Sequence, residues 1–333
     1  MRYAGRGAGR GAAGCGAGQA GQGTTDSEPD HRILSLTSWF ASAPLCPIAV
    51  RLVAPGYSRP VIRHLARMSP AERHLAHAAP RNAAGFVSRW VPVDGLRLHV
   101  RSRNTGAGRP WVLLHGLAVS HRYLMPTAAA LTDGPVHVPD LPGFGLSGKP
   151  RRVYDPVAHA AAVAAWLDLD GVVGARVLAN SFGCQVAVEL AVRRPELVSA
   201  LVLVGPTMDP AAPTATGQAL RWLADLAWED PRQARIIAAD VRDAGPRRIL
   251  RTLRLSVRHR IERRLPLVSA PVLFLRGQHD PIAPARWLSR AAGLTPGSAS
   301  GVVETAGHNA ITTAGAVVAG RAIAFTATAA TAI

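Results

Sequence analysis

The stretch LANSFGCQVA, residues 178–187, places a serine between an apolar run and the start of a helical pattern. The run ARVLAN (175–180) predicts a buried strand, and a helix that begins near 182 leaves only a tight turn for Ser181. Such a turn requires small neighbours, and Ala179 and Gly183 are small. Backbone N–H groups at the helix start could then bind a developing anion beside the hydroxyl. The alternative interpretation is an ordinary helix-capping serine.

A serine hydroxyl is a weak nucleophile until a base removes its proton, so the first interpretation requires a histidine and a carboxylate. Asp280 follows the apolar run PVLFLRG, and His308 follows the run GVVETAG. Three such residues, each just beyond a predicted strand, favour a nucleophilic triad over a cap. Asp209, in GPTMDP, also follows a predicted strand and is the rival acid.

Apolar runs and helical patterns alternate along the rest of the chain. Around Asp94 and Gly95, two alternating segments predict a hairpin. The predicted buried strands are WVLLHG (111–116), VHVPDLPG (136–143), ARVLAN (175–180), ALVLVGP (200–206), PVLFLRG (271–277) and GVVETAG (301–307). The helical patterns between and after them span about 121–132, 155–170, 182–194, 284–293 and 309–325. This alternation predicts an α/β fold: a mostly parallel, twisted sheet with helices on both faces, whose ligands bind at the carboxyl ends of the strands.

The domain organisation follows from where this alternation begins and where it breaks. Residues 1–30 are rich in Gly, Ala and Arg and predict a disordered tail, and residues 31–85 are an N-terminal extension whose structure the pattern leaves open. The core is expected to comprise residues 86–206 and 267–333. Residues 207–266 carry helical patterns without a strand, which predicts a helical cap inserted between two strands of the core.

Four further motifs carry a resemblance to a known family. They are HGLAVS (115–120), DLPGFGLSGKP (140–150), GQHDPIAP (277–284) and AGH (306–308). From about Phe86 to Phe325 the chain resembles an α/β-hydrolase with a helical cap. In α/β-hydrolases the nucleophile, the acid and the histidine follow one another along the chain in this order, and Ser181, Asp280 and His308 have the same order here. DLPGFGLSGKP is the most specific of the four motifs.

The resemblance implies a site and a chemistry. Ser181, Asp280 and His308 would form the catalytic triad, and the backbone amides of Leu117 and Phe182 would form the oxyanion hole. Neither a metal nor an organic cofactor is implied. The expected reaction is hydrolysis of a small or medium carboxylic ester through an acyl-enzyme, with a small-molecule ester or related acyl compound as substrate.

The sequence departs from the family pattern at two positions, and the second departure bears on the substrate. Ala179 replaces the usual first glycine of the elbow, a change of little consequence because alanine is small. The NSFG sequence is similar to the elbow of hydrolases that cleave carbon–carbon bonds in ring-cleavage products. Those relatives usually carry a tryptophan directly after the histidine, where this chain has Asn309. C–C hydrolysis therefore stays an alternative, beside a non-heme haloperoxidase-like perhydrolase and a non-catalytic ligand receptor on the same fold.

Composition excludes several other classes. The chain of 333 residues has 38 basic and 21 acidic residues, a net charge of +17, but Lys149 is its only lysine, which indicates a compositional bias toward arginine. There is no nucleic-acid module, so no nucleic-acid partner is expected. The Arg-rich segment 247–264 favours a solvated helix face over an acidic-substrate site. Trp222 and Trp228 in the cap either line an acyl pocket or pack the cap against the core.

The same composition bears on location and membrane association. Three cysteines form no disulfide framework, which favours the cytoplasm, with secretion as a lesser alternative because of the small-residue spacing of Ala41 and Ala43. Pro44 and Pro47 interrupt the uncharged stretch 33–50, so integral membrane association is not expected. The oligomeric state stays open. The true start codon also stays open, since Met68 would begin a chain that keeps every motif.

Overall fold

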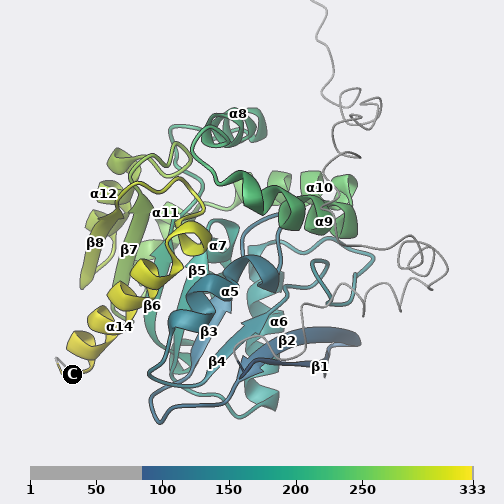
Figure 1. Cartoon of the computed structure of the whole chain (residues 1–333), viewed down its shortest axis with the longest axis vertical. Coiled ribbons are helices and arrows are strands. Elements are labelled where there is room, and N and C mark those ends of the chain that lie inside the picture. The colour runs from purple at the N-terminus through teal and green to yellow at the C-terminus, as the bar shows by residue number, and fades with distance from the viewer. Residues whose placement is uncertain (1–84, 332–333) are drawn as a thin grey trace, which may run out of the picture. The chain divides into compact units, whose positions relative to one another are not determined.

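The computed structural model describes residues 85–331, so the expected tail (1–30) and all but Gly85 of the extension (31–85) lie outside the described residues. Eight strands form one sheet in the order β1-β2-β4-β3-β5-β6-β7-β8 (Figure 1). β1 and β2 are antiparallel to their neighbours, and all later pairs are parallel. The strands are β1 (Val87–Val93), β2 (Leu96–Arg103), β3 (Trp111–Leu114), β4 (Val136–Pro139), β5 (Ala175–Asn180), β6 (Val198–Val204), β7 (Val272–Gly277) and β8 (Ser298–Val303).

Helices cover both faces of this sheet, as the sequence predicts. The α-helices are α5 (His121–Ala130), α6 (Pro156–Leu169), α7 (Phe182–Arg193), α8 (Ala215–Asp225), α9 (Ala234–Ala244), α10 (Pro246–Arg258), α11 (Ile261–Arg264), α12 (Ala285–Leu294), α13 (Ala310–Thr313) and α14 (Gly315–Thr331). Short 3₁₀ helices span Pro195–Leu197, Pro231–Gln233 and Leu265–Leu267. Because side chains alternate along a strand, Val177 and Ala179 of β5 pack into the core under α6 and α7, while Leu178 packs into the opposite core under α5 and α14.

Two predicted elements near the carboxyl terminus differ from the structure. The strand predicted at 301–307 begins earlier, at Ser298, and ends at Val303, which leaves 304–307 as a loop before His308. The helix predicted at 309–325 is broken at Ala314, whose backbone is not helical. The break brings Gly315 against α5, where a Cβ atom would lie 2.7 Å from the carbonyl carbon of Pro126. A uniform helix would not allow this close approach.

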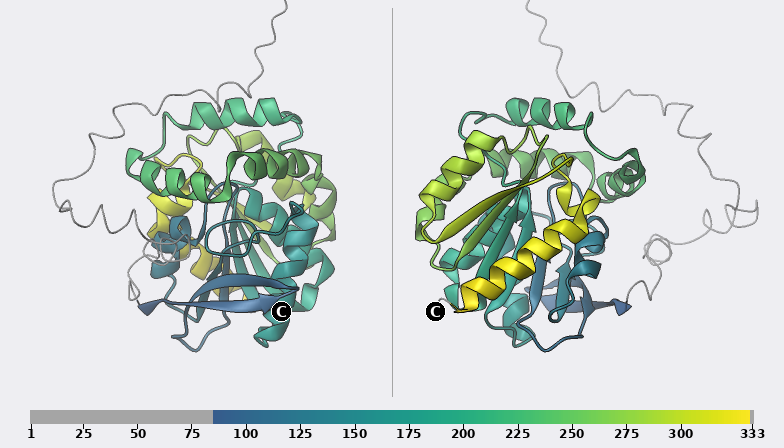
Figure 2. Two further views of the ribbon diagram at one scale, coloured as in Figure 1. Left: turned by 90° about the vertical axis from the view of Figure 1, so that its right-hand side faces the viewer. Right: turned by 60° about the vertical axis from the view of Figure 1, so that its left-hand side comes forward.

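Residues 207–266, which lie between β6 and β7, are here named the inserted segment. It contains α8 to α11, and its described residues include no strand. Its helices α8, α9 and α10 lie beyond the carboxyl ends of the parallel strands in all three views (Figures 1 and 2). The loops that follow β3, β5, β7 and β8 end on the same side. The predicted site residues therefore lie between the sheet and the inserted segment.

None of the helices in the described part of the chain has both the length and the apolar character that crossing a membrane requires.

Candidate active site

Ser181 occupies the turn between β5 and α7. Its φ is +55° and its ψ is −120°, a conformation that L-residues rarely adopt and that stores backbone strain. The serine is in the N-cap position of α7, yet its side chain makes no capping hydrogen bond. A Cβ atom on Gly183 would lie 2.5 Å from the carbonyl oxygen of Leu114, so this position must be glycine. The helix-cap interpretation thus lacks the bond that defines it, and the strained turn keeps the hydroxyl available.

His308 and Asp280 form a buried pair. His308 Nδ1 lies 2.9 Å from Asp280 Oδ2, and the other oxygen of Asp280 accepts hydrogen bonds from the amides of Ile282 (2.8 Å) and Ala283 (2.9 Å). Burial alone would raise the pKa of Asp280, but His308 and these donors outweigh it and hold the pKa below its usual value. Burial likewise lowers the pKa of His308, but the Asp280 charge outweighs it and the net pKa is raised.

The end of β6 brings Ser181 and the His308–Asp280 pair to one place. The amide of Ser181 donates to the carbonyl of Val204 over 3.0 Å. The next residue, Gly205, has a φ of +57°, and a Cβ atom there would lie 2.9 Å from His308 Nδ1 and 3.1 Å from Asp280 Oδ2. The buried Nε2 of His308 has no hydrogen-bond partner among the described residues, so the serine and the histidine are not hydrogen bonded. Such contacts often form only with substrate bound.

The two predicted oxyanion donors lie on neighbouring segments. Phe182 is the first residue of α7, where backbone N–H groups have no partner within the helix. Leu117 lies in the turn after β3, and this turn is held by His115, whose Nδ1 contacts the carbonyl of Gly116 (2.8 Å) and whose Nε2 accepts from the amide of Leu141 (2.9 Å). Leu114, at the end of β3, abuts the start of α7. The two segments are thus adjacent beside Ser181.

Asp209, the rival acid, has other partners. Its carboxylate forms ion pairs with Arg221 (2.9 Å) and Arg286 (2.8 Å) and accepts from the amide of Ala211 (2.9 Å). The side chain that contacts His308 Nδ1 is Asp280. The geometry therefore favours Asp280 as the acid.

Sequence reasoning missed two residues next to the histidine, Asp225 and Glu229. Asp225 accepts a hydrogen bond from the amide of His308 (2.9 Å), and Glu229 accepts one from the amide of Asn309 (2.7 Å). Trp228 stacks its ring on His279, with 4.1 Å between centroids. This stack supports the packing interpretation of Trp228. No local sequence signal marks these contacts, because they join residues about 50 to 80 positions apart.

Tyr123 of α5 links the residue before the serine to the residue after the histidine. Its buried hydroxyl lies 2.7 Å from Oδ1 of Asn180 and 2.8 Å from Oδ1 of Asn309. Asn180 also donates to the carbonyl of Val204 (3.1 Å). Asn309, which stands where a tryptophan is expected in C–C hydrolases, is thus part of a polar link between the two loops.

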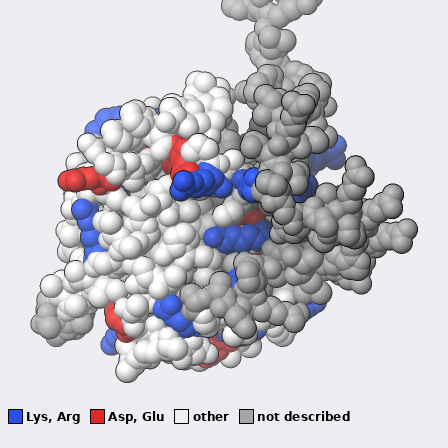
Figure 3. All heavy atoms as spheres, viewed as in Figure 1, with Lys and Arg blue, Asp and Glu red and all other residues white. Residues whose placement is uncertain are grey.

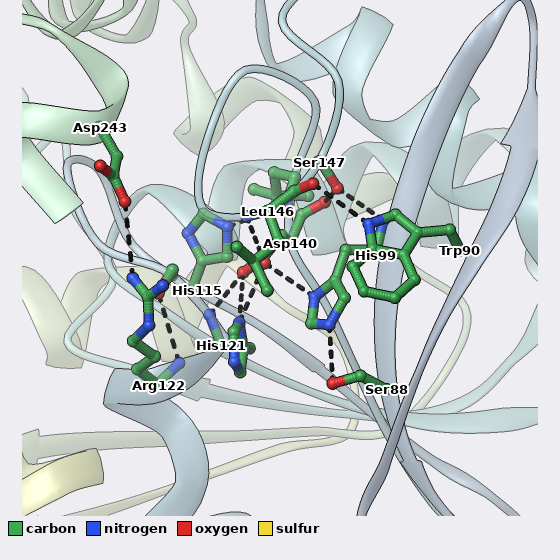
Figure 4. A network of polar contacts seen from close by, with 12 residues as sticks. Ser88, Trp90, His99, His115, His121, Arg122, Asp140, Leu146, Ser147 and Asp243 are labelled. Carbon is green, nitrogen blue, oxygen red and sulfur yellow. Dashed lines mark hydrogen bonds and ion pairs between the residues drawn. The ribbon is translucent and has the colours of Figure 1, made fainter. Parts of the chain in front are cut away.

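Asp140, in the DLPGFGLSGKP motif, is the centre of a buried network (Figure 4). Its carboxylate accepts from the amides of His121 (2.7 Å) and Leu146 (2.9 Å) and from Nδ1 of His99 (2.9 Å) and of His121 (2.9 Å). Burial alone would raise the pKa of Asp140, but its histidine partners outweigh burial and hold it well below its usual value. The network joins β2, α5 and the loop after β4.

Three residues of this network, His99, His121 and Asp140, have the spacing of a metal site. One ligand atom each from His99, His121 and Asp140 lie within 4.8 Å of one another, the only such group among the described residues. Both Nδ1 atoms face the carboxylate as hydrogen-bond donors, and His99 Nε2 is 3.0 Å from Ser88 Oγ. The hydrogen bonds therefore account for the arrangement without a cation.

Asp140→Asn is expected to lower the free energy of unfolding by about 3–5 kcal/mol. The asparagine side chain would place an NH₂ group, which is a donor, where the four donors around Asp140 need an acceptor. The stability that the carboxylate confers is present above its unfolded pKa of about 4 and is lost as the pH falls toward its lower folded pKa. Urea denaturation at pH 7 measures the change. Asp168→Asn, which removes an exposed partner of Arg194, is the control and should change little. Equal midpoints for both variants would contradict the structural role of Asp140.

Basic residues of the inserted segment lie mainly at the surface. Arg251, Arg254 and Arg258 of α10 are exposed, which confirms the predicted solvated face. On the face shown in Figure 3, basic and acidic side chains are interspersed rather than gathered into one stripe. A surface cavity of about 400 Å³ lies at the start of α10. Its lining residues are Arg151, Val153, Ala244, Gly245, Pro246, Arg247, Arg248 and Arg251.

Comparison with known proteins identifies the fold of the chain. The family model described as alpha/beta hydrolase fold matches residues 110–234. A solved membrane phospholipase A, described as a bacterial virulence factor, superposes with a TM-score of 0.68 and 21% identity, covering 88% of this chain and 99% of that one. The chain has the alpha/beta hydrolase fold. A thermophilic esterase from Thermogutta terrifontis, with a TM-score of 0.62 and 22% identity over 73% of this chain and 98% of that one, shares the fold.

Similarity at the sequence level covers only part of the chain. The 2-hydroxymuconate semialdehyde hydrolase of Pseudomonas sp. (strain CF600) is 34% identical over 139 residues, which is 38% of this chain and 46% of that protein. The chain spans about half the length of the curated relatives it matches. The identified fold confirms the predicted fold class.

Proposed function

We propose that the protein is a serine hydrolase that cleaves a small or medium carboxylic ester. The observation that carries the proposal is the strained, uncapped Ser181 beside the buried His308–Asp280 pair, at the carboxyl ends of three strands. The inserted segment would act as a cap, because it lies over these strand ends (Figure 2). The esterase and phospholipase among the structural neighbours support the fold on which this chemistry is placed.

In the proposed reaction, His308 Nε2 accepts the proton of Ser181 Oγ as that oxygen bonds to the ester carbonyl carbon. The amides of Leu117 and Phe182 would stabilise the oxyanion, each by about 3–4 kcal/mol. His308 then returns the proton to the departing alkoxide, and an acyl-enzyme remains. Water, deprotonated by His308, releases the acid and restores Ser181. Asp280 keeps the proton on Nδ1, so that Nε2 is the acceptor, and stabilises the imidazolium.

Labelling with a fluorophosphonate tests the nucleophile before the substrate is known. The full chain at pH 8 is expected to take one label per molecule, and peptide mass spectrometry should locate it on Ser181. Labelling carried out at pH 4, where His308 is protonated, should be slower because a protonated base cannot accept the serine proton. A chain that folds but takes no label would favour the non-catalytic receptor, and a label elsewhere would replace Ser181 as nucleophile.

A second candidate is hydrolysis of a carbon–carbon bond in an acidic, vinylogous diketone. The partial similarity to the semialdehyde hydrolase supports it. Asn309 in place of tryptophan opposes it. Both candidates, and a perhydrolase reaction, use the same triad. Turnover of p-nitrophenyl butyrate without turnover of a ring-cleavage product would support the ester.

A further inference from the structure

The end of α8 and the four residues after it contact both loops of the proposed histidine–acid pair. Asp225 accepts from the amide of His308 (2.9 Å), and Glu229 accepts from the amide of Asn309 (2.7 Å). Trp228, between them, stacks on His279 with an interplanar angle of 7°. One short stretch of the inserted segment is thus attached to the residues on either side of the His308–Asp280 contact.

We propose that Asp225 and Glu229 are positioning residues for His308: they fix the histidine loop through its backbone, and their charges stabilise the imidazolium that forms during the reaction. The inference rests on the proposed function, because it assigns a role to residues beside the proposed base. It makes the inserted segment part of the machinery that orients the histidine, in addition to being a cover.

The histidine loop packs tightly against Asp225, Trp228 and Glu229. A Cβ atom on Gly307 would lie 2.8 Å from Oε1 of Glu229, 3.2 Å from Oδ1 of Asp225 and 3.3 Å from Cβ of Trp228. Asp225 is 1% exposed. Hydrogen bonds from amides to buried carboxylates are about twice as strong as those between neutral groups. A shift of the α8 end would therefore move the His308 backbone with it.

The charges around the histidine act in the same direction. Although burial lowers the pKa of His308, Asp280 raises it most, and Asp225 and Glu229 add to that rise. Burial raises the pKa of Asp225 to about 7, against the opposing effect of His308 and with the support of Glu229 and Asp280. Tyr123 of α5 also interacts with these carboxylates, and its own pKa is raised by burial and by Glu229, Asp225 and Asp280.

Asp225→Asn separates charge from hydrogen bonding, because the amide oxygen still accepts from the His308 amide. We expect the acidic limb of the kcat/KM profile for p-nitrophenyl butyrate to move to lower pH by up to about 0.5 unit, since removing a negative charge lowers the pKa of a nearby histidine and Asp225, with a pKa of about 7, is ionised in part where His308 titrates. Glu304→Gln is the matched control: it removes one carboxylate from an exposed position on the loop that carries His308. Its limb should coincide with that of the wild type.

Gly307→Ala tests the positional part. The added methyl group would displace the two carboxylates, and we expect kcat to fall about tenfold or more with little change in KM, because the histidine and not the substrate is displaced. Thermal unfolding and circular dichroism show whether the variant is folded. Should it not fold, Asp225→Ala is compared with Asp225→Asn, because both variants lack the charge and only the asparagine can still accept from the His308 amide.

A titration of the His308 ring by NMR distinguishes failure of this inference from failure of the proposed function. A lower ring pKa in Asp225→Asn supports the role of the charge even if no ester is turned over. An unchanged ring pKa and an unchanged acidic limb would overturn the inference while leaving labelling of Ser181 intact. Absence of the fluorophosphonate label from the wild type would instead reject the proposed function.

Discussion

Replacing Ser181 with alanine is expected to lower kcat/KM for p-nitrophenyl butyrate by at least about 10⁴-fold. The variant loses the proposed nucleophilic oxygen at the strained turn after β5, while the neighbouring glycines and the helix start stay unchanged. We expect no loss of stability, because the serine side chain makes no capping hydrogen bond whose removal would cost free energy.

The measurement is steady-state hydrolysis together with urea denaturation of the same preparations. Ser300→Ala, at an exposed position of the edge strand β8, is the matched control and should leave both quantities unchanged. The perhydrolase and C–C alternatives predict the same loss for their own substrates. A variant that keeps its activity but is less stable would return Ser181 to the role of a helix cap.

The sequence was sufficient to predict the fold and the order of the proposed triad because both depend on local patterns. Buried parallel strands are continuous apolar runs. Ser181 directly follows β5, and Asp280 and His308 lie in the loops after β7 and β8. The strand β8 was harder to delimit, because as an edge strand it includes the small, polar residues at 298–301 and pairs on one side only.

The contacts of the inserted segment could not be predicted for a different reason. Asp225 and Glu229 lie at the end of an amphipathic helix, where acidic residues ordinarily face solvent. Their partners, the amides of His308 and Asn309, are about 80 positions away, and only the tertiary packing brings them together. Asn309 likewise gave no sequence signal for its contact with Tyr123. Side-chain to backbone contacts over such separations leave no periodicity in the chain.

Asp280→Asn is expected to reduce kcat by about 10⁴-fold through the wrong tautomer of His308. One oxygen of Asp280 accepts from the amides of Ile282 and Ala283, so the asparagine must place its carbonyl oxygen there. Its NH₂ group then faces His308 Nδ1, which becomes an acceptor, and the ring proton moves to Nε2, where it cannot accept the serine proton.

The matched control for this prediction is Asp209→Asn. Asp209 belongs to an ion-pair cluster with Arg221 and Arg286, so its replacement should affect stability more than kcat, which we expect to change no more than a few-fold. Single-turnover acylation by p-nitrophenyl butyrate, normalised to folded protein, compares the two variants. Asp280→Asn should also lower the pKa of the His308 ring, because the charge that raises it most is gone. If Asp209→Asn lost acylation and Asp280→Asn kept it, the acid would have to be reassigned to the strand end after β6, and the 2.9 Å contact between Asp280 and His308 would be structural only.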